Sequence, residues 1–356
     1  MHTSSHRHGV CSIVPPYMLR ALAEQGRPAV MRAAGRTVAH DELIRRLRAL
    51  RATGGREDPA SADAAADGPH KSRTVSDARQ TMRLPGTTVR SEGQAPTGDV
   101  AVNEAYDGTG ATFDLYWDVF QRDSIDGAGL PLLSTVHYGA RYDNAFWDGS
   151  QMIFGDGDGR VFNRFTIAVD VIGHELTHGV TDHLAGLQYQ GQSGALNESM
   201  SDVFGSLVKQ RVNGQTAAEA DWLIGEGLFT SRVDGVALRS MKAPGTAYDD
   251  AQLGGKDPQP ATMADYVETD DDDGGVHINS GIPNRAFYLA ALAFGGSSWE
   301  QAGAIWFATL SDPKVKATST FTAFATRTSA NAATLFGSEA QKIVKAAWKG
   351  VGITAR

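Results

Sequence analysis

The segment His174-Glu175-Leu176-Thr177-His178 places two histidines four residues apart. Residues at this spacing on an α-helix lie about 40° apart around the axis, so both imidazoles can reach one metal ion from the same face. Glu175 lies about 100° from His174, which lets its carboxylate contact a water beside the metal without ligating the metal. The pattern indicates a zinc site with a general base, although five residues of this kind also occur by chance in ordinary helices.

A third ligand decides what kind of zinc site this segment could form. One class of zinc enzymes carries a histidine six residues beyond the second, but that position is Leu184, and His183 lies about 140° from His178 around the helix. After a glycine-rich turn, a second helical segment carries Glu198 and Asp202. If this segment returns antiparallel, Glu198 can reach the metal, and Asp202 can accept the outer N–H of a ligand histidine. Two histidines and one glutamate leave a fourth position for water, which is typical of catalytic zinc.

These residues need a helical scaffold, and most of the chain after Asp170 has the apolar periodicity of helices. The predicted helices span residues 171–183, 195–211, 283–294, 299–310, 319–335 and 339–348. From residue 73 to about 165, short apolar segments separated by Gly, Asp and Asn predict a mostly β region, with strands at 87–90, 130–138 and 151–154. Residues 155–159 repeat Gly and Asp as a calcium loop does, but without the spacing and glutamate of an EF-hand, so a plain turn is favoured. We therefore expect an α+β fold with a β-rich first half and a helical second half.

The first 72 residues differ from the rest of the chain. Residues 1–51 predict a small helical unit, with helices at 17–25 and 40–51, that is too short to fold alone. Residues 52–72 are rich in Gly, Ala, Asp, Pro and Ser, the composition of a flexible linker that proteases can cut. We expect four parts: a helical unit at 1–51, a linker or processing region at 52–72, a domain carrying the histidine helix at 73–190, and a helical domain at 191–356.

Composition excludes several classes of function. Of the 356 residues, 41% are hydrophobic and 21% are charged, and no apolar run approaches the ~18 residues of a spanning helix, so we expect no membrane partner. The net charge of -8 would repel nucleic acid, and the basic cluster at residues 45–51 does not reverse this expectation.

Two features near the N-terminus bear on location. The single cysteine, Cys11, cannot form an intramolecular disulfide, which fits a reducing compartment. Pro15, Pro16 and Arg20 interrupt the apolar run that a secretory signal would need. We therefore expect a cytoplasmic protein, with secretion by a non-classical route left open.

Several separated blocks of the sequence resemble the thermolysin-like neutral metallopeptidases. They cover roughly residue 73 to the C-terminus, in the family's order, and comprise Asn144 to Trp147, Gly173 to Val180, Gly194 to Glu198, Ser201 to Gly205, Leu238 to Met241 and Gly274 to Gly281. The segment from Cys11 to Tyr17 resembles the short propeptide of the protealysin-type subgroup. The resemblance implies a two-domain thermolysin-like fold with a zinc cleft between the domains. It also implies a zinc endopeptidase that is made as a zymogen with its own propeptide.

The resemblance further implies a role for each matching residue. One catalytic zinc ion would be held by His174, His178 and Glu198, and Asp202 would support a ligand histidine. Glu175 would be the general base that takes a proton from the attacking water and passes it to the leaving amine. Peptides and proteins would be the substrates.

The same resemblance implies the groups that stabilise the reacting carbonyl. His277 and Tyr189 would hydrogen-bond the oxyanion of the tetrahedral intermediate, and Asp272 would orient His277. Taken singly, this histidine and this tyrosine are more often ordinary loop and core residues. Their positions in matching blocks favour the catalytic interpretation.

Substrate contacts follow from the same blocks. Asn144 and Ala145 match the edge segment along which a peptide lies extended, and Arg239 matches a residue that binds the substrate carbonyl beyond the cleaved bond. The pocket for the residue after that bond would be lined by Phe162, Phe165, Val171 and Leu238. All four are apolar, which implies cleavage before bulky hydrophobic residues. Phe165 taken alone could equally be a core residue.

Calcium is expected at fewer sites than in calcium-rich relatives. Asp170, Asp221 and Glu226 match calcium ligands of the family, but Lys209 and Leu223 stand where acidic ligands are expected. Two lost carboxylates and one added positive charge should abolish at least one calcium ion.

Two other functions were compared with the endopeptidase. A zinc aminopeptidase would have the same ligands, but it usually carries a Gly-x-Met-Glu-Asn block, which this sequence lacks. A catalytically silent binding protein on the same fold would be expected to lose Glu175, Glu198 or His277, and all three are present.

Cys11 admits two hypotheses. Its thiolate could occupy the fourth position on zinc and keep a zymogen silent. The alternative, which we favour, is a small buried residue in the propeptide's own packing, with Pro15-Pro16-Tyr17 making the inhibitory contact through shape.

Overall fold

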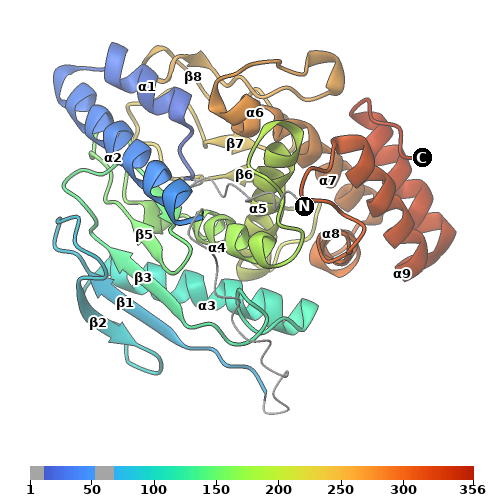
Figure 1. The fold of residues 1–356 in the computed structure, drawn as a ribbon, viewed down its shortest axis with the longest axis horizontal. Coiled ribbons are helices and arrows are strands. Elements are labelled where there is room, and N and C mark those ends of the chain that lie inside the picture. The colour runs from blue at the N-terminus through green and yellow to red at the C-terminus, as the bar shows by residue number, and fades with distance from the viewer. Residues whose placement is uncertain (1–11, 53–67) are drawn as a thin grey trace.

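The computed structural model describes residues 12–52 and 68–356 (Figure 1). Cys11 and most of the predicted linker at 52–72 lie outside these ranges, so both hypotheses for Cys11 stay predictions. Within the described ranges, no helix is long and apolar enough to cross a membrane. The fold joins a five-stranded sheet to a helical second half, which confirms the expected α+β class.

The main sheet places one short strand at its edge. Its strands are β1 (Arg73–Asp77), β2 (Thr87–Ser91), β3 (Leu132–Val136), β4 (Ala145–Trp147) and β5 (Met152–Phe154), in the order β2-β1-β3-β5-β4. Strands β1, β3 and β5 are parallel, and β2 and β4 are antiparallel to their neighbours. The predicted segments overlap β2, β3 and β5. The edge strand β4 has one side left for another extended segment.

The predicted β region also contains a long helix, α3 (Val100–Phe120), that the pattern did not indicate. The prediction is wrong there because Asn, Asp, Gly and Thr, which are common in loops, occupy much of the segment. The side chain of Asp99 caps the helix by accepting the N–H groups of Ala101 and Val102. A Cβ at Gly108 would lie 2.3 Å from Cδ1 of Ile172, so this glycine lets α3 pack closely against the next helix.

The candidate metal ligands come from two central helices, α4 (Val169–His183) and α5 (Gly191–Val212). Their backbones approach closely, because a Cβ at Gly205 would lie 2.3 Å from the carbonyl oxygen of Asp170. The helices run antiparallel, as expected, so residues late in α4 face residues early in α5. This arrangement turns one face of each helix toward the other.

Between α5 and the later helices the chain is largely not helical. Residues 213–271 form loops and two small antiparallel pairs, β6 (Leu223–Ile224) with β7 (Arg239–Ser240) and β8 (Asp249–Asp250) with β9 (Gly255–Lys256). The prediction of helices almost throughout the second half is therefore wrong for this segment, where Gly and Asp recur and favour turns.

The remaining helices follow the prediction more closely. They are α6 (Asp272–Asn279), α7 (Gly281–Phe294), α8 (Ala304–Leu310) and α9 (Phe321–Gly350). Helix α9 joins two predicted helices across Gly337, which has a φ of 80°. Four short helical turns complete the described elements: η1 (Phe165–Ile167), η2 (Ala251–Leu253), η3 (Met263–Asp265) and the π-helical η4 (Trp299–Gly303).

The N-terminal unit consists of α1 (Pro16–Gln25) and α2 (Pro28–Ala52), shown in blue in Figure 1. Helix α2 begins at Pro28, so the predicted start at residue 40 is wrong. The prediction missed the first part of the helix because its buried face there consists of the small residues Val30, Ala33 and Ala34, whose periodicity is weak. The apolar side chains of α1 join the main hydrophobic core. The unit is therefore docked on the rest of the molecule.

Candidate active site

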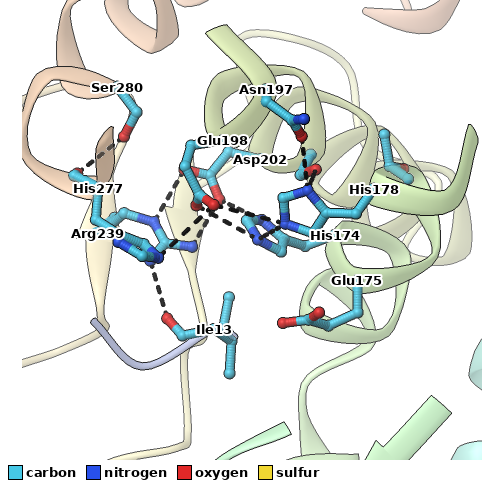
Figure 2. Close-up of polar contacts among 12 residues, drawn as sticks. Ile13, His174, Glu175, His178, Asn197, Glu198, Asp202, Arg239, His277 and Ser280 are labelled. Carbon is cyan, nitrogen blue, oxygen red and sulfur yellow. Dashed lines mark hydrogen bonds and ion pairs between the residues drawn. The ribbon is translucent and has the colours of Figure 1, made fainter. Parts of the chain in front are cut away.

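Three buried side chains of α4 and α5 converge on one point that could hold a metal ion: His174, His178 and Glu198 (Figure 2). Their ligand atoms lie within 4.8 Å of one another. The Nε2 atoms of the two histidines are 3.0 Å apart, and a different oxygen of Glu198 lies 3.6 Å from each. The three predicted ligands are thus brought together.

Hydrogen bonds on the outer side of each imidazole fix the nitrogen that faces this point. Nδ1 of His174 donates to Oδ1 of Asp202 at 2.8 Å, and Nδ1 of His178 donates to Oδ1 of Asn197 at 2.7 Å. Both Nε2 atoms therefore turn their lone pairs toward each other, which is favourable when a cation lies between them. Two imidazoles and one carboxylate are a donor set that catalytic zinc uses, so the residues present fit zinc.

Burial and charge favour the forms of these residues that bind metal. Burial lowers the pKa of His178 to about 4, and His174 adds to the shift, so this imidazole is neutral near pH 7. Burial alone would raise the pKa of Glu198, but His277, His174 and His178 outweigh it and lower the pKa to about 2. A neutral imidazole and an ionised carboxylate are the states in which these groups ligate metal.

Glu175 is buried between the histidine helix and the edge of the sheet. The backbone N–H of Trp147, in β4, donates to Oε2 of Glu175 at 3.1 Å. Figure 2 shows its carboxylate beside the ligand cluster and apart from the point on which the three ligands converge. Its position is therefore compatible with a group that moves a proton without binding the metal.

A second cluster extends from Glu198 on the other side. The hydroxyl of Tyr189 donates to Oε1 of Glu198 at 2.5 Å and lies 3.1 Å from Nε2 of His277. Nδ1 of His277 donates to Oδ1 of Asp272 at 2.6 Å. Burial alone would lower the pKa of His277, but Asp272 and Glu198 raise it to about 9. The imidazole is therefore a charged donor near neutral pH.

Asp202 anchors several elements behind the metal ligands. Besides Nδ1 of His174, it accepts Nε and Nη2 of Arg239 at 2.9 and 2.8 Å and Nδ2 of Asn284 at 2.8 Å. Sequence reasoning missed Asn284, which comes from a distant helix, and missed the role of Asn197. Asn197 directly precedes Glu198 within a quoted block, which was a signal that could have identified it.

The edge strand β4 is paired with the chain's own residues 12–14. Ser12 forms an antiparallel bridge with Phe146, and Ile13 donates its N–H to the carbonyl oxygen of Ala145 at 3.2 Å. Oδ1 of Asn144 accepts the N–H of Val14 at 3.0 Å. Nη1 of Arg239 donates to the carbonyl oxygen of Ile13 at 3.1 Å. The three predicted substrate-contact residues Asn144, Ala145 and Arg239 thus all bind one extended backbone segment.

Comparison with known proteins identifies the family. The catalytic-domain model of thermolysin metallopeptidases matches residues 59–182, and the alpha-helical domain model of the same metallopeptidases matches residues 185–353. The chain belongs to the thermolysin family of metallopeptidases. This family uses zinc, and His174, His178 and Glu198 form the cluster that could hold the zinc ion in this chain. The expectation of a zinc endopeptidase is confirmed.

Two relatives match this thermolysin-family chain over almost its whole length. The extracellular metalloprotease of Pectobacterium carotovorum subsp. carotovorum is 51% identical, over 98% of this chain and 97% of the relative. Protease PrtS of Photorhabdus sp. (strain Az29) is 46% identical, over 97% and 92%. The solved precursor of protealysin, a metalloproteinase from Serratia proteamaculans, is 51% identical, with a TM-score of 0.87 over 97% of this chain and 100% of that chain. These matches support the protealysin-type subgroup and a precursor form.

The expectation of a cytoplasmic thermolysin-family protein is wrong. The relative from Pectobacterium carotovorum subsp. carotovorum and another from Serratia marcescens (strain ATCC 21074 / E-15) are named extracellular metalloproteases, which points to secretion. The expectation rested on one cysteine and on an interrupted apolar run near the N-terminus. A cleavable hydrophobic leader is one route of export, and its pattern does not report on other routes.

The residues that match the family's calcium ligands surround a lysine instead. Nζ of Lys209 lies 2.8 Å from Asp221, 3.1 Å from Glu226 and 3.6 Å from Asp170. Burial raises the pKa of Asp170 to about 6 even though Lys209 opposes the shift. Burial alone would lower the pKa of Lys209, but Asp170 and Asp221 outweigh it and raise the pKa. An ammonium group therefore supplies positive charge where the resemblance implies a calcium ion.

The four residues predicted to line the substrate pocket cannot be distinguished from the surrounding core residues. Phe162, Phe165, Val171 and Leu238 are all buried in the main hydrophobic core. The ring centroids of Phe162 and Phe165 lie 5.5 Å apart. Because core packing alone would produce the same burial, their role in specificity stays a prediction.

Proposed function

We propose that this thermolysin-family zinc endopeptidase is made as an inactive precursor, and that the processed enzyme acts outside the cell. In this proposal residues 1–51 are the propeptide, 52–72 contain the processing region, and 73–190 and 191–356 form the two catalytic domains. The processed enzyme cleaves peptide bonds on the amino side of bulky hydrophobic residues. The observation that carries the proposal is the extended segment 12–14, whose backbone is bound by β4 and Arg239.

We assign the zinc ligands to His174, His178 and Glu198. When bound, zinc supplies a Lewis acid that polarises the peptide carbonyl and lowers the pKa of a water molecule. Asp202 and Asn197 keep the two imidazoles in the orientation and tautomer that ligation needs.

Glu175 is assigned as the general base. It takes a proton from the attacking water and transfers it to the nitrogen of the leaving amine. The hydrogen bond from Trp147 holds one carboxylate oxygen next to the strand along which the substrate would lie. Burial of this group excludes bulk water and strengthens its interaction with the reacting atoms.

His277 and Tyr189 are assigned to the oxyanion that develops on the substrate carbonyl. Because the pKa of His277 is raised to about 9, its imidazole carries a proton that it can donate near neutral pH. Asp272 fixes the ring by accepting both the backbone N–H and Nδ1–H of His277. Donors that are already oriented before reaction stabilise developing charge most effectively.

The substrate would take the place of residues 12–14 as an added strand. Asn144 and Ala145 would bind its backbone, and Arg239 would bind the carbonyl beyond the cleaved bond. Main-chain contacts of this kind provide affinity without sequence preference. The preference would come from the side chain after the cleaved bond and its apolar pocket of Phe162, Phe165, Val171 and Leu238.

A panel of peptides tests this function. The peptides carry blocked amino termini and differ at one position, with Leu, Ile, Phe, Gly or Asp after the bond to be cleaved. We expect the processed enzyme to prefer the bulky apolar residues by at least about tenfold in kcat/KM. Cleavage that requires a free amino terminus would support an aminopeptidase instead. Absence of hydrolysis by the zinc-loaded, processed protein would support a silent binding protein.

A further inference from the structure

The bond between Ser12 and Ile13 lies among the groups assigned to catalysis. On its carboxyl side, the backbone of Ile13 is held twice, through its N–H by Ala145 and through its carbonyl by Arg239. Arg239 is itself paired with Asp202, which contacts the ligand His174. The segment is thus tied, through the side chains of Arg239 and Asp202, to His174 in α4.

The pairing with β4 shows where Ser12, the residue before the same bond, lies relative to Glu175. Ser12 lies opposite Phe146 in the antiparallel bridge, and the next residue of β4, Trp147, donates its N–H to the carboxylate of Glu175. Going from Ile13 back to Ser12 therefore leads along β4 toward Glu175. Figure 2 shows Ile13 facing the space between Arg239 and Glu175, with the three zinc ligands beside it.

The side chain of Ile13 also meets the requirement proposed for substrates. It is bulky and apolar, and it is completely buried in the main hydrophobic core together with the four predicted pocket residues. Ser12, Val14 and Pro15 are buried as well, so the whole segment is enclosed rather than lying across the surface. The chain therefore presents an apolar residue directly after a bond that is fixed at the site.

We propose that the Ser12–Ile13 peptide bond is a self-cleavage site of the precursor. The proposal rests on the proposed function. Water adds its hydroxyl to the carbonyl carbon of Ser12, and the C–N bond to Ile13 breaks. Glu175 accepts a proton from the water and returns it to the nitrogen of Ile13. The products are a carboxylate at Ser12 and an amino group at Ile13, and no other reactant is needed.

Cleavage at this bond leaves the propeptide bound. Helix α2 is attached by separate contacts: Asp41 accepts Nδ2 of Asn144 at 2.9 Å and the hydroxyl of Tyr142, and Oγ1 of Thr37 accepts the N–H of Asp143 at 3.1 Å. None of these contacts depends on the Ser12–Ile13 bond. The cut therefore produces a nicked complex in which the new chain end at Ile13 still occupies the edge strand. Activation needs a second event, the loss of α1 and α2.

The test follows the full-length, zinc-loaded precursor by mass spectrometry during incubation. We expect the full-length chain to be replaced by a chain of residues 13–356 and a peptide of residues 1–12, while hydrolysis of an added peptide stays low. The Glu175→Gln precursor should form these two products at least about 100-fold more slowly. Ile13→Asp should abolish cleavage at this bond, whereas Leu43→Asp, which changes an exposed position of α2, should leave it unchanged.

Folding of the variants is checked in the inactive background. In Glu175→Gln precursors, Ile13→Asp should lower the melting temperature more than Leu43→Asp does, because it places a charge in a buried position. If a processed enzyme hydrolyses the peptide panel but its precursor never yields a chain beginning at Ile13, the self-cleavage proposal is wrong and the segment is an uncleaved inhibitor. If the processed enzyme hydrolyses no peptide at all, it is the proposed function that fails.

Discussion

At the residue scale, the site separates groups that hold metal from a group that moves a proton. The three ligands converge on one point, whereas Glu175 is held at the sheet edge by Trp147. Glu175→Gln preserves the shape of the side chain and keeps an oxygen that can accept this hydrogen bond. We expect the variant to retain its zinc while peptide hydrolysis falls by at least about 100-fold.

Metal analysis and kinetics on the same preparation measure both properties. Glu300→Gln provides the matched control, since this glutamate is exposed and distant in sequence from the site. Turnover that is unchanged in Glu175→Gln would contradict the proposed base. Loss of zinc in that variant would show that Glu175 contributes to metal binding.

His137 forms ion pairs with two aspartates that lie in different segments of the β-rich half. Its Nε2 lies 2.9 Å from Asp99, which caps α3, and its Nδ1 lies 2.9 Å from Asp156, in the glycine-rich turn. The hydrogen bond to Asp156 makes the largest contribution to the pKa of His137, which is raised to about 9, and Asp99 adds to it. The turn favoured for residues 155–159 therefore carries an ion pair within the described structure.

This ion pair predicts a loss of stability at alkaline pH. A histidine whose pKa is raised on folding adds stability that is complete below its unfolded value of about 6.5 and is lost as the pH rises through about 9. Since the three groups are partly exposed, we expect a decrease of roughly 1 kcal/mol in the free energy of unfolding over this range. Urea unfolding of the Glu175→Gln precursor at several pH values measures it. His137→Gln should remove this pH dependence, and an unaltered slope would exclude the ion pair as its source.

At the element scale, the crossing of α4 and α5 sets the metal geometry. Gly205→Ala would place a Cβ 2.3 Å from the carbonyl oxygen of Asp170, so the helices must move apart. We expect a cost of about 1–3 kcal/mol in the free energy of unfolding, together with weaker zinc binding. Gly35→Ala is the matched control: it makes the same change within α2, where nothing lies within 4 Å of the new atom, and should stabilise the helix by up to about 1 kcal/mol.

Thermal or urea unfolding and zinc titration distinguish the two substitutions. Equal stability of both alanine variants would show that the helices adapt without strain. Weaker zinc binding by Gly205→Ala alone would link the close crossing to the ligand positions.

The elements also show which kinds of information the sequence carries. Two histidines on one helical face are a local pattern, and the spacing predicted both this helix and its partner. Helix α3 lacks such a pattern because its packing depends on Gly108 and on the distant Ile172. Similarly, Asn284 reaches Asp202 from a helix far along the chain. No spacing rule connects these positions, so such contacts could be identified only from the fold.

At the scale of the whole molecule, stability should depend little on calcium. The ammonium group of Lys209 lies among Asp170, Asp221 and Glu226 and already balances part of their charge. A calcium chelator too weak to remove zinc should therefore change the melting temperature only slightly. Scanning calorimetry of the Glu175→Gln precursor with and without the chelator measures the effect.

The effect of the chelator on stability is compared with the effect of removing the positive charge by Lys209→Met. It leaves the buried carboxylate of Asp170 without its nearby cation and should cost about 3 kcal/mol or more in the free energy of unfolding. A large loss of stability on chelation of the unsubstituted protein, reversed by calcium alone, would show that a calcium site persists.

The short edge strand β4 has a consequence for how the protein is handled before it acts. An open edge presents unpaired N–H and C=O groups that recruit strands from other molecules, which leads to aggregation. In the precursor, residues 12–14 cover this edge, and Pro15 then ends the pairing because it has no N–H to donate. The segment that occupies the proposed substrate strand thus also covers an edge that would otherwise be open to strands from other molecules. Once it leaves, this edge is open to an extended substrate, and because β4 spans only three residues it offers little length for pairing with another copy of the enzyme.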